Sequence, residues 1–214
     1  MKVTAGLLFK FAVDSDYASR NIAENLYTGN DETDTHDPFS MDELSRIRRA
    51  VGFLPYADYV LFLCYTGFRP GEMLALKKDA LHIENNGKRM YIIGGGKTEA
   101  GSNRPVTIPP AIREIALNRY RDHPETEYLF PDGTKPMDHE YFREYIFTPL
   151  MENLGITGKV PYSCRHTYSN LIKNAPGDTG DKARLMGHTD YTFTQERYQS
   201  SALDDLEKIT NSLT

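Results

Sequence analysis

The apolar residues of this chain keep a helical spacing over most of its length and change to an alternating pattern in one stretch only. One set recurs at intervals of three and four residues: Met41, Leu44, Ile47, Val51 and Leu54. This spacing predicts an amphipathic helix. Residues 81–93 alternate instead around Asn85-Asn86-Gly87, which is a hairpin signal, and residues 105–108 read as a third short strand. The sequence therefore predicts a mainly α (α+β) domain with one small three-stranded antiparallel sheet.

Capping signals divide the helical part of the chain. Ser40 and Glu43 have the spacing of a capping box, Gly67 closes a buried helix over residues 56–66, and Pro70 suits the first turn of the next helix. Further helices are predicted over residues 7–13, 110–122, 138–154, 163–174, 180–187, 191–199 and 201–212.

Composition excludes several classes of protein. The chain has 214 residues, of which 39% are hydrophobic and 26% charged, so it can bury a core. Its longest nearly apolar run, residues 59–68, is shorter than the roughly 20 residues that span a membrane. Two cysteines, Cys64 and Cys164, are too few for a disulfide scaffold. We therefore expect a protein of the reducing cytoplasm.

Charge is distributed unevenly along the chain. The formal net charge is -5, and residues 1–40 hold seven acidic and three basic side chains. The remaining residues are close to neutral, so a basic face for nucleic acid is not excluded. Residues 29–38 combine acids with turn formers and lack periodic apolar residues, which predicts a linker.

Two segments or residue sets are similar to common ligand-binding motifs. The segment GGGKT at 94–98 resembles the end of a phosphate-binding loop, but Tyr91 occupies the position that needs the first glycine. The six histidines do not form an HExxH motif or another paired-ligand spacing. The sequence therefore predicts neither a nucleotide site nor a metal site.

Cationic residues at turns and element starts are the more specific feature. They are followed near the C-terminus by a histidine and a tyrosine, and the series reads Arg69, Lys97, Arg165, His188 and Tyr198. Arginine binds phosphate oxygens with two parallel N–H groups, and a tyrosine oxygen can act as a covalent nucleophile. Fixed cations can hold the charge that develops on a phosphodiester during transfer. The set is suited to metal-free transfer at a phosphodiester.

In order and spacing, these segments resemble the tyrosine recombinase (phage integrase) family. Four segments carry the resemblance: TGFRPGEMLAL, GKT with RPVTIP, SCRHT and LMGHTDYTFTQERY. The resemblance is closer to integrases of phages and of conjugative or integrative elements than to chromosome-dimer resolvases. It implies a catalytic domain over residues 37–200. Residues 1–36 would be a remnant of the core-binding domain, its last helix plus the acidic linker, and residues 201–214 a C-terminal amphipathic tail.

The resemblance implies site-specific DNA recombination, by integration or excision, through a 3′-phosphotyrosyl intermediate. Tyr198 matches the nucleophile, and Lys97 matches the general acid that protonates the leaving 5′ oxygen. The remaining matches are two phosphate-binding arginines, a histidine donor and a supporting acid: Arg69, Arg165, His188 and Glu72. The resemblance implies no cofactor and no metal.

Tyr162 is the one departure from the family's catalytic pattern. The family commonly has histidine at this position, three residues before the second arginine. A phenol can donate a hydrogen bond to a phosphoryl oxygen, but it is a poor proton shuttle near neutral pH. We expect Tyr162 to face the point where Arg69 and Arg165 converge; the alternative is a buried aromatic that turns away.

The resemblance also implies partners. They are double-stranded DNA and further copies of the protein in a synaptic tetramer, together with accessory DNA-bending factors and no membrane. The host would be a bacterium, or a phage or mobile element within it. The chain reads as a catalytic fragment of a longer protein, or alternatively as a natural short member of the family. The apolar residues of the tail should dock on the catalytic domain of the same chain or of a neighbour.

Two alternative functions share these motifs. A topoisomerase IB-like enzyme would nick and reseal one duplex with the same residues and without exchanging strands. A non-catalytic relative would bind DNA and form no covalent link.

Overall fold

The computed structural model describes residues 2–25, 37–94, 105–186 and 200–213. The chain divides into two compact units, an N-terminal unit, Met1–Thr35, and a C-terminal unit, His36–Thr214. The N-terminal unit contains α1, Lys2–Asp14, and a 3-10 helix η1, Ile22–Asn25. Asn21 Nδ2 donates to Gly6 O at 3.2 Å, and Asn21 Oδ1 accepts from Ala23 N, so one side chain ties these two helices together.

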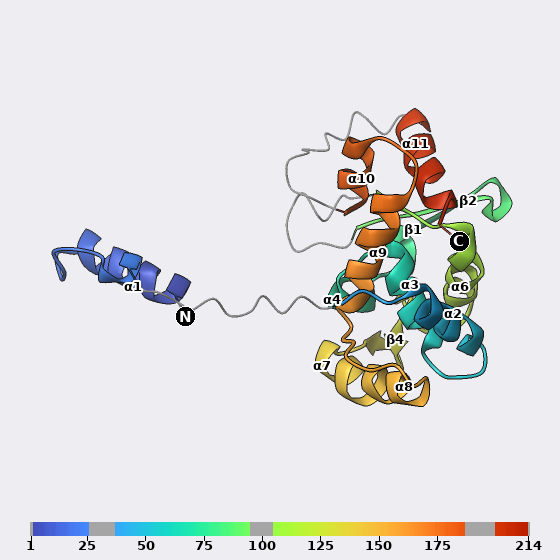
Figure 1. The fold of residues 1–214 in the computed structure, drawn as a ribbon, viewed down its shortest axis with the longest axis horizontal. Helices are drawn as coiled ribbons and strands as arrows, with labels where there is room; N and C mark the ends of the chain where they lie inside the picture. The colour runs from blue at the N-terminus through green and yellow to red at the C-terminus, as the bar shows by residue number, and fades with distance from the viewer. Residues whose placement is uncertain (1, 26–36, 95–104, 187–199, 214) are drawn as a thin grey trace. The chain divides into compact units, whose positions relative to one another are not determined.

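The C-terminal unit holds the remaining helices and strands (Figure 1). Its helices are α2 Met41–Ala50, α3 Ala57–Thr66, α4 Pro70–Leu74, η2 Lys78–Ala80, η3 Asn85–Gly87, α6 Pro110–Arg121, α7 His139–Tyr141, the π-helix η4 Phe142–Phe147, α8 Thr148–Asn153, α9 Ser163–Asn174, α10 Thr179–Met186 and α11 Ser200–Asn211. Its strands are β1 Leu81–Glu84, β2 Arg89–Ile93, β3 Pro105–Thr107, β4 Pro131–Asp132 and β5 Lys135–Pro136.

Helix α3 forms the centre of the core. Nine of its ten residues are buried, because α2, α6 and α9 pack around it. Figure 1 shows α9 beside α3, with α10 and α11 at one end of the unit and α7, α8 and β4 at the other. At the end of α3, Gly67 adopts φ +64°, and a Cβ at this position would lie 2.1 Å from the Tyr168 ring. This close approach of α9 to the turn requires glycine.

The three-stranded sheet has the order β1-β2-β3, and both pairings are antiparallel. Leu81 pairs with Ile92 and Tyr91 pairs with Thr107. This confirms the prediction of a mainly helical fold with one small three-stranded antiparallel sheet. A second, two-stranded sheet joins β4 and β5. Each of its strands has two residues, so no alternating pattern was available to predict it.

The C-terminal helix α11 packs on the sheet of its own chain. It buries an apolar stripe, Leu203, Leu206, Ile209 and Leu213. Thr210 Oγ1 lies 2.7 Å from Thr107 Oγ1 on β3. Arg89 forms ion pairs with Asp204 and Glu207. The tail is therefore docked in cis.

Some of the sequence predictions fall outside the described residues. These include the helix at 191–199 and the turn that carries Lys97. Among the described helices, none combines the length and the apolar character needed to cross a bilayer.

Candidate active site

Arg69 sits at the start of α4, directly after the turn at Gly67. Its backbone is extended, and Pro70 occupies the first helical position. Glu72 Oε2 accepts from Arg69 N at 2.9 Å, while Glu72 Oε1 pairs with Arg69 Nη1 at 2.6 Å. The hydrogen bond that Arg69 donates to Glu72 is the main cause that raises the pKa of Arg69. The side chain of Arg69 is 56% exposed, so a ligand can reach it from solvent.

Arg165 lies in the first turn of α9 and is only 9% exposed. Its Nη1 donates to Gly67 O, and its Nη2 donates to Met186 O at 2.7 Å. These two carbonyl groups fix the plane of the guanidinium between the turn before Arg69 and the end of α10. Because each terminal nitrogen carries a second N–H, these contacts leave donors for a further acceptor.

Tyr162 precedes α9 and completes the cluster. Its side chain forms hydrogen bonds with both Arg69 and Arg165, and its ring packs edge-on against His166 at 5.3 Å between centroids. The residue is 36% exposed. The phenol thus lies beside the two guanidinium groups, and its catalytic role stays a prediction.

The two arginines disfavour each other's charge. Burial is the main cause that lowers the pKa of Arg165, and the positive charge of Arg69 lowers it further. A phosphate group placed between the two guanidinium groups would remove this repulsion and replace solvent with charge-assisted hydrogen bonds. The electrostatics of the cluster therefore favour an anion.

Three of the residues singled out in the sequence are not described. Lys97, His188 and Tyr198 lie outside the described residues, so their place relative to this cluster stays a prediction. Met186, whose carbonyl accepts from Arg165, is two residues before His188. Within the described part of the chain, no group of three or more His, Cys, Asp or Glu side chains could hold a metal ion.

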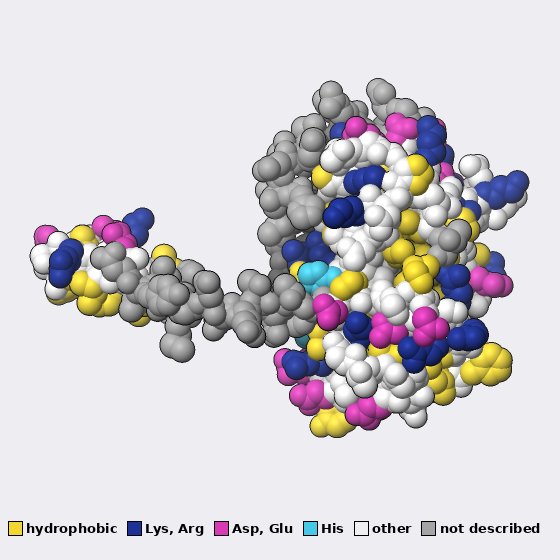
Figure 2. All heavy atoms as spheres, viewed as in Figure 1, with side chains coloured by type: hydrophobic (Ala, Val, Ile, Leu, Met, Phe, Trp, Pro, Cys, Tyr) yellow, Lys and Arg dark blue, Asp and Glu magenta, His cyan; other side chains and the backbone are white. Residues whose placement is uncertain are grey.

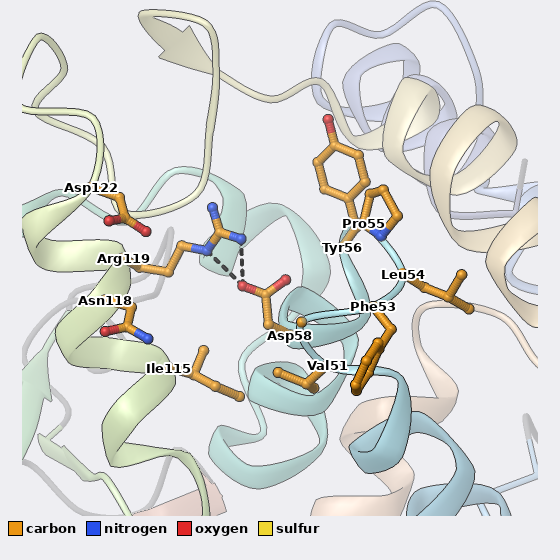
Figure 3. A pocket seen from close by; sticks show the side chains of 11 residues that line it. Val51, Phe53, Leu54, Pro55, Tyr56, Asp58, Ile115, Asn118, Arg119 and Asp122 are labelled. Carbon is orange, nitrogen blue, oxygen red and sulfur yellow. Dashed lines mark hydrogen bonds and ion pairs between the residues drawn. The ribbon is translucent and has the colours of Figure 1, made fainter.

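A separate hollow lies at the other end of α3. It has a volume of about 380 Å³, and its lining includes Phe53, Tyr56, Asp58, Asn118 and Arg119. Figure 3 shows Arg119 and Asp58 pointing toward each other between α6 and α3. The Nε and Nη2 atoms of Arg119 both bind Asp58 Oδ2, at 2.6 and 2.5 Å. This arginine is engaged by the protein itself, so we do not assign the hollow to the active site.

The surface of the C-terminal unit does not concentrate positive charge on the face shown in Figure 2. Among the described residues on that face, Lys and Arg side chains are interspersed with Asp and Glu side chains. Attraction of an anion on this face would depend on local groups of cations rather than on one broad basic patch.

Sequence reasoning missed the carbonyl contacts that orient Arg165. Nothing in the local sequence indicates that Gly67, 98 residues earlier, accepts a hydrogen bond from this side chain. It also missed the contact between Cys64 and Cys164, whose side chains are hydrogen-bonded in the core. Glu72, by contrast, is named from the sequence as a supporting acid, and its three-residue spacing from Arg69 is a local signal of a helix start.

Comparison with known proteins identifies one relative by sequence and several solved structures with a similar fold. The chain is 24% identical over 226 residues to IntQ of Escherichia coli strain K12, a protein described as defective. The alignment covers 89% of this chain and 56% of IntQ. The Tn1549 transposon integrase, solved with circular-intermediate DNA, superposes with a TM-score of 0.71 at 16% identity, covering 88% of this chain and 70% of the other.

A lambda integrase dimer bound to a COC′ core site superposes with a TM-score of 0.63 at 15% identity, covering 93% of this chain and 74% of the other. The present chain thus spans little more than half the length of IntQ. The Phage integrase family matches residues 41–204, which include every candidate site residue. The chain belongs to the phage integrase family.

Proposed function

We propose that this chain is the catalytic part of a site-specific tyrosine recombinase that cleaves and rejoins double-stranded DNA. The observation that carries the proposal is the cluster of Arg69, Arg165 and Tyr162, in which one phenol lies beside two guanidinium groups. Membership of the phage integrase family supports it. Although IntQ is described as defective, every catalytic position of the present chain except 162 matches the family residue.

The reaction would proceed through two transesterifications. The Tyr198 oxygen attacks the scissile phosphorus, the bond to the 5′ oxygen breaks, and Lys97 gives that oxygen a proton. The 5′-hydroxyl of the partner strand then attacks the phosphotyrosine and releases Tyr198. The two arginines, His188 and the Tyr162 phenol stabilise the charge on the nonbridging oxygens in both steps. Glu72 orients Arg69. The scheme uses no cofactor and no metal.

The assembly and the location belong to the same proposal. A lambda integrase has been solved as a tetramer bound to a Holliday junction, and the Tn1549 integrase has been solved with DNA. We infer that the protein acts as a synaptic tetramer on DNA in the bacterial cytoplasm, together with accessory DNA-bending factors. The nick-and-reseal alternative would use the same residues, and the contacts described above do not favour it.

Covalent trapping on a nicked DNA substrate tests the chemistry. The parent chain should form a protein–DNA adduct that survives denaturation and the presence of EDTA, and Tyr198→Phe should abolish the adduct while leaving DNA affinity intact. Tyr120→Phe, an exposed tyrosine on α6, is the matched control and should trap DNA like the parent. An adduct formed by Tyr198→Phe, or strict dependence on magnesium, would refute the proposed mechanism. Holliday-junction formation between two labelled duplexes separates recombination from nick-and-reseal activity.

A further inference from the structure

The chain enters the C-terminal unit through a short segment that is fixed to α9. We call Pro38–Ser40 the entry segment. Phe39 N donates to Thr167 Oγ1 at 2.8 Å, and Thr167 Oγ1 donates in turn to Ser163 O at 2.8 Å. The Phe39 and Thr167 side chains are both buried. The hydroxyl of Thr167 is therefore engaged on both sides, by the entry segment and by the first turn of α9.

Lys159 holds the same segment from the loop before α9. Its Nζ donates to Pro38 O at 2.9 Å and lies 3.7 Å from Glu43 Oε2. Glu43 Oε2 also accepts from Ser40 N at 2.7 Å. The lysine side chain is only 11% exposed, and Nζ lies 5.9 Å from the centroid of the Phe39 ring. A lysine this buried serves a specific contact rather than solubility.

The two contacts flank Tyr162 and Arg165 on both sides. Between them the backbone forms a tight turn, in which Ser163 N donates to Val160 O at 2.8 Å and Val160 N donates to Ser163 Oγ at 3.2 Å. The turn leads directly into α9. A displacement of Lys159 would therefore pass to Tyr162 through hydrogen-bonded backbone rather than through a free loop.

We propose that Lys159 and Thr167 are positioning residues that clamp the entry segment and thereby set the place of the Tyr162 phenol relative to Arg165. The proposal rests on the function proposed above for Tyr162 and Arg165. It also implies regulation: the entry segment contacts the two residues that flank Tyr162 and Arg165 in the sequence. Force or rotation applied to the entry segment reaches the reacting phosphate through these contacts.

Lys159→Met is the variant that tests the clamp. It removes the N–H donors and the charge but keeps an unbranched stem beside Phe39. Single-turnover cleavage of a nicked substrate should slow by about 10-fold, since small misplacement of a catalytic group carries costs of this order or more. DNA affinity should stay at the parent value. In tyrosine-labelled protein without DNA, the NMR signals of the Tyr162 ring can be assigned by their loss in Tyr162→Phe. These signals should shift in Lys159→Met.

Arg46→Met is the matched control. Arg46 also anchors α2 to a distant loop, because its Nη1 donates to Leu154 O and Gly155 O at 3.0 and 3.2 Å and its Nη2 pairs with Asp42. These two carbonyl groups lie at the start of the connection between α8 and α9, whereas the turn from Val160 to Ser163 lies at its end. Arg46→Met should lower the midpoint of urea unfolding as Lys159→Met does, yet cleave at the parent rate and leave the Tyr162 signals in place.

Variants of Thr167 provide a second test of the clamp. Thr167→Ser keeps the hydroxyl and should cleave like the parent, whereas Thr167→Val should behave like Lys159→Met. Unmoved Tyr162 signals in Lys159→Met, or equal slowing by Lys159→Met and Arg46→Met, would overturn the clamp. Absence of covalent adduct from the parent chain would instead refute the proposed function, and the NMR comparison would still decide the clamp.

Discussion

The two ends of α3 carry ion pairs of the same chemistry with opposite consequences. At the N-terminal end, Arg119 directs two nitrogens at Asp58 and lies over the Tyr59 ring at 4.8 Å, and both partners of the pair are largely buried. At the C-terminal end, Glu72 contacts one nitrogen of Arg69 and leaves this side chain more than half exposed. The first pair is complete within the protein, while the second orients a cation toward solvent.

The comparison shows that the residue types at a hollow do not identify a ligand site. The hollow of Figure 3 contains an arginine, an aspartate and aromatic rings. What separates the two ends is the group that each arginine contacts. Arg165 is held by two neutral carbonyl groups and lies near the positive charge of Arg69, whereas Arg119 directs two nitrogens at a carboxylate and lies over an aromatic ring.

The largest expected effect comes from replacing Arg165, which lies near the C-terminal end of α3. Arg165→Lys keeps the charge but cannot contact Gly67 O, Met186 O and a phosphate with one planar group. Cleavage of a nicked substrate should fall by roughly 100- to 1,000-fold, the order seen on loss of one preorganised donor. Single-turnover kinetics with Arg119→Lys alongside provides the contrast. Equal rates for the two variants would erase the distinction between the two ends.

Breaking the Arg119–Asp58 ion pair should lower the stability of the fold and leave the rate of DNA cleavage unchanged. Asp58→Asn removes the carboxylate and leaves the Arg119 guanidinium largely buried without its counter-charge. The free energy of unfolding should fall by about 1–3 kcal/mol, measured by urea denaturation. Cleavage per folded molecule should match the parent. A loss of cleavage out of proportion to unfolding would assign a catalytic role to this end.

Glu72→Gln should give the smallest effect and the sharpest test of orientation. The amide keeps an acceptor for Arg69 N but loses the charge that pairs with Nη1. Because one partner is exposed, unfolding should change by less than about 1 kcal/mol. Cleavage should slow several-fold, while DNA affinity stays equal or rises with the loss of a negative charge. Glu125→Gln, which breaks an exposed pair with His123, is the control. An unchanged cleavage rate in Glu72→Gln would remove its orienting role.

Local signals account for the part of the fold that the sequence predicted. The capping box of Ser40 and Glu43 starts α2 as expected, and Gly67 ends α3 in the left-handed conformation. The hairpin signal at residues 85–87 lies between β1 and β2. Each of these features depends on interactions within about four residues, which a pattern in one sequence can express.

The remaining features depend on contacts between distant parts of the chain. Lys159 reaches Pro38 across 121 residues, and Arg165 reaches Gly67 across 98. No periodicity or motif spacing encodes such pairs. The expectation that Arg69, Arg165 and Tyr162 belong to one site came from the family resemblance, which supplied a long-range arrangement. For Lys97, His188 and Tyr198 that arrangement stays a prediction.

The carbonyl of Gly67 has a consequence for how the site moves. Arg69 follows this residue by two positions, and Arg165 donates to its oxygen. The Tyr168 ring, one turn further along α9, lies where a side chain at position 67 would be. Both arginines are therefore tied to the peptide group of Gly67, Arg69 through the backbone and Arg165 through a hydrogen bond. We therefore expect displacements of α3 and α9 to shift the two cations together, so that the spacing offered to two phosphoryl oxygens varies less than the position of either cation.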